Sequence, residues 1–150
     1  MKSNNMYRLE DVIMMSGLSE RTVRRHLKEG LLSGSKLGGT WQFNEADIKA
    51  YMERKTTMGL ITQEASEQVK MFLKGAMHSM KTMQVCTIID MHDLSQAKLS
   101  TLRQQVLDIS NANPTKFTMK FNTDKKITRI TLTGDADYVE KVLDAAKAVA

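Results

Sequence analysis

The stretch GLSERTVRRHLKEGLL, residues 17–32, concentrates cationic side chains at spacings that suit a polyanionic partner. Its cations are Arg21, Arg24, Arg25, Lys28 and, at low pH, His26. Arginine can donate two hydrogen bonds to guanine O6 and N7, and both Arg and Lys neutralise phosphates. A basic helix can also be no more than a solvated surface. The surrounding elements must decide between these interpretations.

Two short helices joined by a tight turn are predicted to position these cations. Leu9, Val12 and Ile13 share one face of a helix over residues 9–16, and Gly17 ends it. Ser19 is a favourable N-cap for a second helix over residues 19–29, whose buried stripe is Val23 and Leu27. The pattern is a helix-turn-helix whose second helix exposes its hydrogen-bond donors.

A hairpin and a third helix follow. Leu31–Leu32 and Trp41–Phe43 predict two short strands, separated by the glycine-rich loop SGSKLGGT at residues 33–40. Trp41 and Phe43 are expected to pack as core residues under this loop. Asn44 caps a helix that continues to residue 52. The layout predicts a winged helix-turn-helix with residues 33–40 as the wing.

The remaining chain predicts a linker helix and a second domain. Residues 53–61 lack apolar periodicity and read as a linker, and from Thr62 a heptad seam runs through Val69, Leu73, Ala76, Met80 and Met83. Residues 83–150 predict the order strand, helix, strand, strand, helix, a small βαββα domain. The expected fold class is therefore α+β. Its predicted parts are a DNA-binding domain at 1–55, a linker and dimerisation helix at 56–82, and a dimerisation or effector domain at 83–150.

Residues 6–52 resemble a known group of DNA-binding modules. The opening LEDV, the turn and helix GLSERTVRRHLKEGLL, the glycine loop before WQF and the closing NEADIKAYM are similar to MerR-like and excisionase-like winged helix-turn-helix domains. The resemblance implies double-stranded DNA as the partner, with the second helix in the major groove and the wing over the flanking backbone. MerR-like members usually form dimers, whereas excisionase-like members bind as monomers or arrays. The Arg25–His26 pair departs from the two aromatics of many MerR proteins, and nothing beyond residue 55 resembles a family.

Roles at the interface follow from position on the second helix. Arg21, Thr22 and Arg24 lie in its first turns, where side chains approach base edges. Arg25 and Lys28 are expected to contact phosphates, which position the protein without reading sequence. Further contacts are expected from the helix N-terminus, the wing tip and the entry to the first helix, at Ser19, Lys36, Arg8 and Tyr7.

Two other chemistries are weighed against DNA binding. Thioether, thiol and imidazole groups could bind a soft metal, but a single cysteine without a CxxC motif favours core packing instead. These groups are Met77, His78, Met80, Met83, Cys86, Met91 and His92. No catalytic constellation is present: the chain has no phosphate-binding loop and no HExxH. We expect no metal, no cofactor and no enzymatic activity.

Composition is consistent with a cytoplasmic protein that binds a polyanion. The 150 residues carry a formal charge of +5 and 41% hydrophobic residues, enough for a core. No apolar run approaches the roughly 20 residues of a membrane span. The lone Cys86 excludes an internal disulfide, and the N-terminus lacks a signal-peptide core. We expect a bacterial, phage or mobile-element protein in the cytoplasm.

These observations favour a sequence-specific transcription regulator that forms a homodimer through residues 62–150 and responds to an unidentified small-molecule or protein effector. The alternative is an excisionase-like architectural or recombination-accessory protein, whose sites would lack strict two-fold symmetry. A third interpretation makes residues 83–150 the main interaction or ligand-binding domain, which DNA binding only localises.

Overall fold

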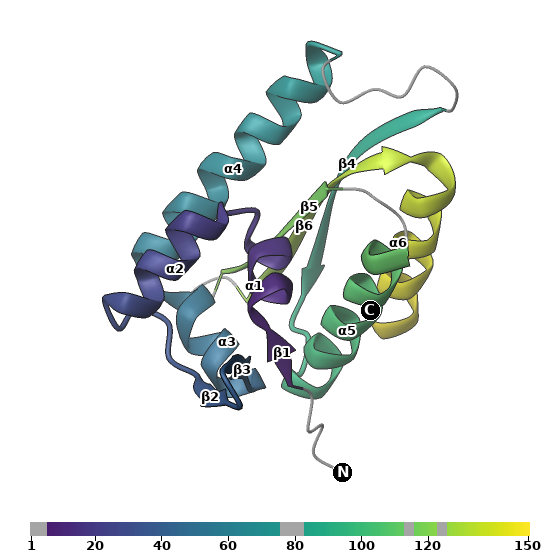
Figure 1. The fold of residues 1–150 in the computed structure, drawn as a ribbon. Helices are drawn as coiled ribbons and strands as arrows, with labels where there is room; N and C mark the ends of the chain where they lie inside the picture. Colours follow the sequence, from purple (N-terminus) through teal and green to yellow (C-terminus); the bar gives the residue numbers. More distant parts are fainter. Residues whose placement is uncertain (1–5, 76–82, 113–115, 123–125) are drawn as a thin grey trace.

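The computed structural model describes residues 6–75, 83–112, 126–150 and, as backbone, 116–122. It is a mixed helix-and-strand protein, as expected (Figure 1). The N-terminal part contains β1 (Tyr7–Arg8), α1 (Leu9–Ser16), α2 (Glu20–Lys28), β2 (Ser35–Leu37), β3 (Thr40–Phe43) and α3 (Glu45–Glu53). The chain continues with α4 (Lys55–Leu73), β4 (Gln84–His92), α5 (Gln96–Ala112), β5 (Lys116–Asn122), β6 (Ile127–Asp135) and α6 (Ala136–Val149).

The turn between α1 and α2 forms where the sequence predicted it. Gly17 adopts the left-handed conformation at φ 71°, which glycine enters without steric cost, and its N–H donates to the Ile13 carbonyl at 3.0 Å. Ser19 then caps α2: its Oγ accepts a hydrogen bond from the Thr22 backbone N–H at 3.2 Å. The segment is therefore a helix-turn-helix.

A small antiparallel sheet, in the order β1-β3-β2, follows the helix-turn-helix. Gly38 and Gly39, both at positive φ, connect β2 to β3, as two-residue hairpin turns favour. The prediction of a strand at Leu31–Leu32 is wrong. Leu32 instead joins the buried core, and the first hairpin strand lies inside the segment expected to be loop. The apolar pair marked burial rather than strand structure.

The second sheet is antiparallel in the order β4-β6-β5 and lies between helices. Alternation along β6 sends Ile130 and Leu132 to one face, where they join a core that includes Leu102 of α5 and Val142 of α6. Thr133 points to the other face and accepts a hydrogen bond from Gln68 of α4 at 3.0 Å. Figure 1 shows this arrangement, with α4 on one side of the sheet and α5 and α6 on the other.

The predicted linker at residues 53–61 is wrong, because α4 begins at Lys55 and runs as one helix to Leu73. Its inner face uses Thr57, Ile61 and Gln68, all buried. Two of these three residues are polar, so apolar periodicity could not reveal the helix. Among the described residues, no helix combines the length and the apolar composition needed to cross a membrane.

The predicted heptad seam is only partly described. Val69 faces the chain's own sheet, where it lines a hollow with Ile88 and Thr131, whereas Leu73 is 78% exposed. Residues Ala76 and Met80 of the seam lie outside the described residues. The described end of α4 therefore does not present a single apolar stripe to a partner helix.

A buried polar junction joins the N-terminal part to α5. Arg103 of α5 is 3% exposed and forms an ion pair with Glu45, the first residue of α3. Glu45 also accepts hydrogen bonds from the Tyr7 hydroxyl at 2.6 Å and the Gln96 amide at 3.1 Å. Burial lowers the pKa of Arg103 to about 10, so the guanidinium remains charged at neutral pH. The junction fixes the helix-turn-helix against the second sheet and its helices.

Candidate nucleic-acid interface

The exposed side of α2 carries a single stripe of cations. At 3.6 residues per turn, side chains at positions 21, 24, 25 and 28 lie on one side of the helix. All four are exposed: Arg21, Arg24, Arg25 and Lys28, the cationic stripe. Val23 is fully buried on the opposite side. Burial and charge are therefore cleanly separated around this helix.

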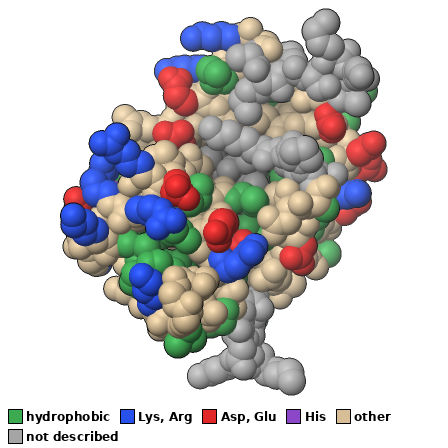
Figure 2. All heavy atoms as spheres, viewed as in Figure 1, with side chains coloured by type: hydrophobic (Ala, Val, Ile, Leu, Met, Phe, Trp, Pro, Cys, Tyr) green, Lys and Arg blue, Asp and Glu red, His purple; other side chains and the backbone are tan. Residues whose placement is uncertain are grey.

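Figure 2 shows where these charges lie on the surface. Lys and Arg side chains gather at the left edge of the view, where Figure 1 places α2. This edge is on the same side of the second sheet as α4 and faces away from α5 and α6. The cationic stripe thus faces outward and is open to a large polyanion.

Two cations of the stripe form weak ion pairs with carboxylates of the same helix or its C-cap. Arg24 lies 3.6 Å from Glu20, and Arg25 lies 3.9 Å from Glu29. All four side chains are more than half exposed, and exposed pairs four residues apart contribute only about 0.3–0.5 kcal/mol. A phosphate or a guanine edge can therefore replace the carboxylates at small cost.

The first turn of α2 is capped by its own hydroxyl groups. Ser19 Oγ caps the helix and donates to Thr22 Oγ1 at 2.9 Å, so both hydroxyls already belong to the cap. The remaining backbone N–H groups of this turn point out of the helix end, where the helix dipole favours negative charge. Ser19 therefore positions the helix end more than it supplies a donor of its own.

His26 is buried and does not belong to the exposed cations, which corrects the interpretation of His26 as a low-pH cation at the surface. Its Nδ1 lies 2.6 Å from the hydroxyl of Tyr51 in α3. Burial and the Arg25 charge lower the pKa of His26, and burial raises the pKa of Tyr51 to about 12. Both side chains are therefore neutral at neutral pH, and the Tyr51 hydroxyl can donate to Nδ1. This bond holds α2 against α3.

The β2–β3 hairpin carries one exposed cation, Lys36. Its Nζ lies 5.8 Å from the centre of the Trp41 ring on the paired strand, within cation–π range. Trp41 in turn stacks on the buried Phe43, with ring centres 6.2 Å apart. The tryptophan is partly buried and structural, as predicted, and it supports the lysine at the surface.

The prediction that Tyr7 contacts DNA is wrong. Its side chain is 1% exposed, and its hydroxyl is bound to Glu45 in the polar junction. Arg8 is exposed, but its guanidinium lies 3.9 Å from Asp11 and its backbone N–H bonds the same carboxylate at 2.8 Å. Arg8 lies on β1, which pairs with β3 of the hairpin (Figure 1), so its contact with DNA stays a prediction. The interface therefore centres on α2 and the hairpin.

Sequence reasoning did not find the residue that orients α2. Tyr51 is 25 positions from His26 and looks like part of an amphipathic helix. The one sequence feature that could have indicated this role is the position of Tyr51 on the apolar face of α3, because a buried hydroxyl group needs a hydrogen-bond partner. A histidine on α2 supplies that partner.

The described residues give the metal interpretation no support. None of them form a group of three or more His, Cys, Asp or Glu side chains that could hold an ion. Cys86 is partly buried on β4, and burial raises the pKa of its thiol, which disfavours the thiolate form that binds metals. Met77, His78 and Met80 lie outside the described residues.

Residues 6–56 match a family model described as a helix-turn-helix domain, about a third of the chain. No curated protein and no solved structure matches the chain. The match coincides with β1 to α3, the segment in which the cationic stripe and the hairpin lie. The N-terminal third is thus a helix-turn-helix segment, and the chain is a DNA-binding helix-turn-helix protein.

Proposed function

We propose that this chain is a sequence-specific DNA-binding transcription regulator that inserts α2 into the major groove. The observation that carries the proposal is the separation on α2, with four exposed cations on one side and Val23 and His26 buried on the other. A recognition helix needs this arrangement, because one side must be anchored while the other enters the groove. The proposal includes no catalytic activity.

Within this proposal the stripe divides into reading and positioning residues. Arg21, Thr22 and Arg24 approach base edges from the first turns of α2, where arginine can bond guanine O6 and N7. Arg25 and Lys28 contact phosphates farther along the helix. The helix N-terminus at Ser19 receives another phosphate. The β2–β3 hairpin acts as a wing, and Lys36 contacts the flanking backbone.

The regulator acts as a homodimer through the part of the chain that follows α3. Two copies related by a two-fold axis would read two half-sites of an inverted repeat, as in MerR-like regulators. Residues 62–150 carry the dimer contact and the site for an effector, either a small molecule or a protein.

The test is selection of bound duplexes from a random DNA pool by the full chain, with Arg24→Ala run in parallel. The proposal expects an enriched motif with two-fold symmetry, which the Arg24→Ala protein enriches weakly or with relaxed preference at one position of each half-site. Lys70→Ala, which removes an exposed cation from α4, is the matched control and should enrich the wild-type motif.

Two other outcomes would overturn the proposal. Enrichment of tandem, unsymmetric motifs would support an excisionase-like architectural protein instead of a dimeric regulator. No enrichment at low salt would mean that α2 does not read sequence, because non-specific phosphate contacts alone carry no base preference.

A further inference from the structure

The strand β4 forms one edge of the second sheet. It pairs antiparallel with β6 over nine residues, Gln84–His92, and no strand of the described part pairs with its other side. The opposite edge, β5, is flanked by α1, α3 and α4, which bring the N-terminal part against it. The two edges therefore differ in their surroundings, and within the described part of the chain β4 is the open one.

The sequence of β4 carries little of the protection that is normal for an edge strand. QVCTIIDMH contains no lysine and no proline, whereas KFTMKFN of β5 contains Lys116 and Lys120. Ile88, at the centre of β4, is 55% exposed. The one carboxylate on the strand, Asp90, is already bound by Arg129 of β6 at 2.7 and 2.8 Å. A long edge that is rich in β-branched residues and whose charge is paired within its own sheet is a template for another strand, so a stable protein is expected to cover it.

We propose that β4 pairs with β4 of a second copy of this chain, antiparallel and centred on Ile88, to form a continuous six-stranded sheet. The inference rests on the proposed function and deepens it, because it names the element that makes the homodimer. We infer a second copy of this chain at the edge for two reasons. A β4–β4 pair has a register that a two-fold axis allows, and the same axis places the DNA-binding surfaces of both copies on one side of the sheet.

Symmetry and length set the register. In a two-fold antiparallel pair, opposite residues lie on the same face of the sheet, so the positions of each pair sum to an even number. Ile88 is the midpoint of β4, so a pair centred there overlaps the whole strand. Asp90 then lies opposite Cys86 of the second copy, and the two exposed Ile88 side chains meet. A pair centred on Asp90 would oppose two carboxylates and shorten the overlap.

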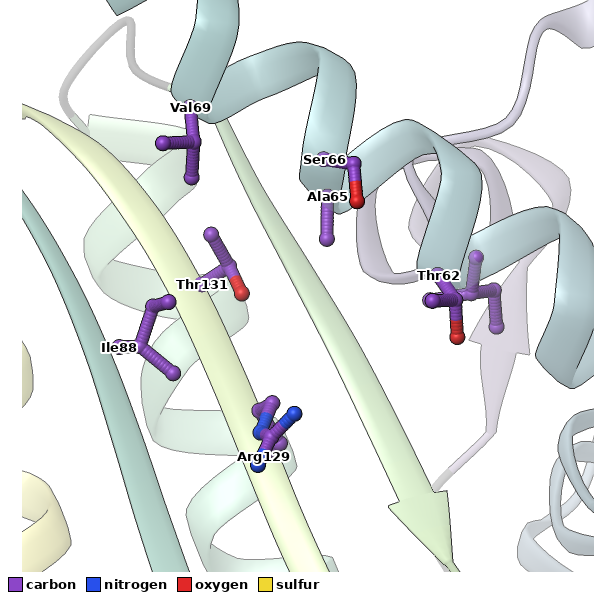
Figure 3. Close-up of a pocket in the computed structure, with 8 residues that line it drawn as sticks. Thr62, Ala65, Ser66, Val69, Ile88, Arg129 and Thr131 are labelled. Carbon is purple, nitrogen blue, oxygen red and sulfur yellow. The ribbon is translucent and has the colours of Figure 1, made fainter.

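The same axis directs both DNA-binding surfaces to one side. Figure 3 shows Ile88 on the face of the sheet that Thr131 and Arg129 share, below Ala65 and Val69 of α4. A two-fold axis through paired edge strands runs perpendicular to the sheet, so this face points the same way in both copies. The cationic stripe faces outward on this side of the sheet (Figures 1 and 2). Two stripes that face the same way can contact one duplex.

The edge pair also leaves the N-terminal part clear of the contact. The elements α1 and α3 lie against β5, at the opposite edge from β4. The second copy at β4 therefore does not cover α2 or the hairpin. By contrast, α4 uses Ile61 and Gln68 against its own sheet, so a pair of α4 helices would have to form on the remaining exposed residues.

The experiment measures the mass of the full chain by sedimentation equilibrium over a range of concentrations. Wild type is expected to be a dimer. Ile88→Lys and Ile88→Glu should each raise the dimer Kd by about 10- to 100-fold, since each removes an apolar contact and opposes two like charges. An equimolar mixture of the two variants should recover the dimer, because the introduced lysine of one copy then faces the introduced glutamate of the other.

Leu73→Lys is the matched control. Leu73 is even more exposed than Ile88 and belongs to the predicted heptad seam, so the variant introduces the same charge at the competing contact. The inference expects a dimer for this variant. A monomeric wild type, an unchanged dimer in Ile88→Lys, a dimer lost in Leu73→Lys, or no recovery in the mixture would each overturn it. Because Ile88 is exposed, far-ultraviolet circular dichroism should show the same fold for all variants.

The inference can fail separately from the proposed function. Ile88→Lys should bind a duplex with one half-site as wild type does and lose affinity only for the paired half-sites. Suppose that the Ile88 variants disrupt the dimer as expected, but that the wild-type protein enriches no DNA. This result would overturn the proposed function and leave the edge contact standing. Specific binding by a wild-type monomer would overturn the edge contact and the homodimer, and would leave only the sequence-specific DNA binding by α2 standing.

Discussion

Arginines serve opposite purposes in α2 and in α5. On α2 the arginines of the cationic stripe are exposed, and two of them are held only by carboxylates of the same helix or its cap at 3.6 and 3.9 Å. On α5 Arg103 is buried and bound to Glu45 of another element. Exposed charge is available to a partner at little cost, whereas buried charge is already committed to its ion pair.

The difference separates the binding surface from the framework that holds it. Removing a charge from α2 should change binding and leave the fold intact. Removing the Arg103 charge should lower the free energy of unfolding, and it should affect DNA binding only through that loss of stability.

The largest effect is expected at the polar junction. Arg103→Met leaves the Glu45 carboxylate without its cation, and breaking a buried pair in this way costs about 3–5 kcal/mol of unfolding free energy. Urea unfolding of the full chain measures it. The double variant Arg103→Met/Glu45→Gln should recover part of the loss, since no uncompensated charge remains. A loss as small as that of Arg24→Ala, within about 0.5 kcal/mol, would contradict the structural role of Arg103.

The next largest effect is expected for binding at Arg24. Arg24→Ala should weaken binding to the selected site by about 1–3 kcal/mol and change binding to unrelated duplexes less. Lys28→Ala should weaken binding to all duplexes alike and reduce the salt slope by about one. Fluorescence anisotropy with specific and scrambled duplexes, at several salt concentrations, separates the two. Identical behaviour of the two variants would remove the distinction between reading and positioning residues.

A smaller effect is expected from His26 as the pH falls. Because its pKa is lowered in the folded chain, the unfolded chain binds a proton more readily below about pH 6.5. The contribution of His26 is therefore present at neutral pH and is lost as the pH falls through the folded-state pKa. His26→Gln cannot titrate and should show a shallower loss of unfolding free energy between pH 7.5 and 5. If the unfolding free energy of the two proteins fell in parallel over this pH range, His26 would not be the source of the loss.

The smallest effect is expected at Glu20. Glu20→Gln removes a negative charge beside Arg24 and should strengthen DNA binding slightly, most visibly at low salt. The same change weakens the first turn of α2 by about 0.3–1 kcal/mol, because Glu20 complements the helix dipole. The DNA affinity measured by anisotropy should thus rise, while the free energy of unfolding measured in urea should fall. Weaker binding in this variant would mean that Glu20 orients Arg24 for contact.

Local signals made the helix-turn-helix predictable. Gly17 and Ser19 mark the turn, and Val23 with the surrounding cations marks the two sides of α2. These features are all set within a few residues. The sequence also indicated that the second half mixes helices and strands, because Leu102 and Ile130 belong to clear apolar patterns.

The remaining features depend on partners far apart in sequence. The polar inner face of α4 at Thr57 and Gln68 concealed that helix from apolar periodicity. Tyr7 was predicted to contact DNA because the partner of its hydroxyl group, Glu45, is 38 positions away and is not evident from the neighbouring sequence. His26 looked like a surface cation for the same reason. Which polar side chain is buried is decided by the tertiary neighbour, and a single sequence does not reveal it.

The most direct test of the cationic stripe compares two variants with the same loss of charge. One changes Arg21, Arg24, Arg25 and Lys28 to glutamine, and the other changes the exposed Lys70, Lys98, Lys141 and Lys147 to glutamine. Duplex affinity is measured for both across a salt series. The stripe variant should lose most of its affinity and of its salt dependence, while the control retains both. Equal losses in the two variants would mean that net charge, rather than α2, binds DNA.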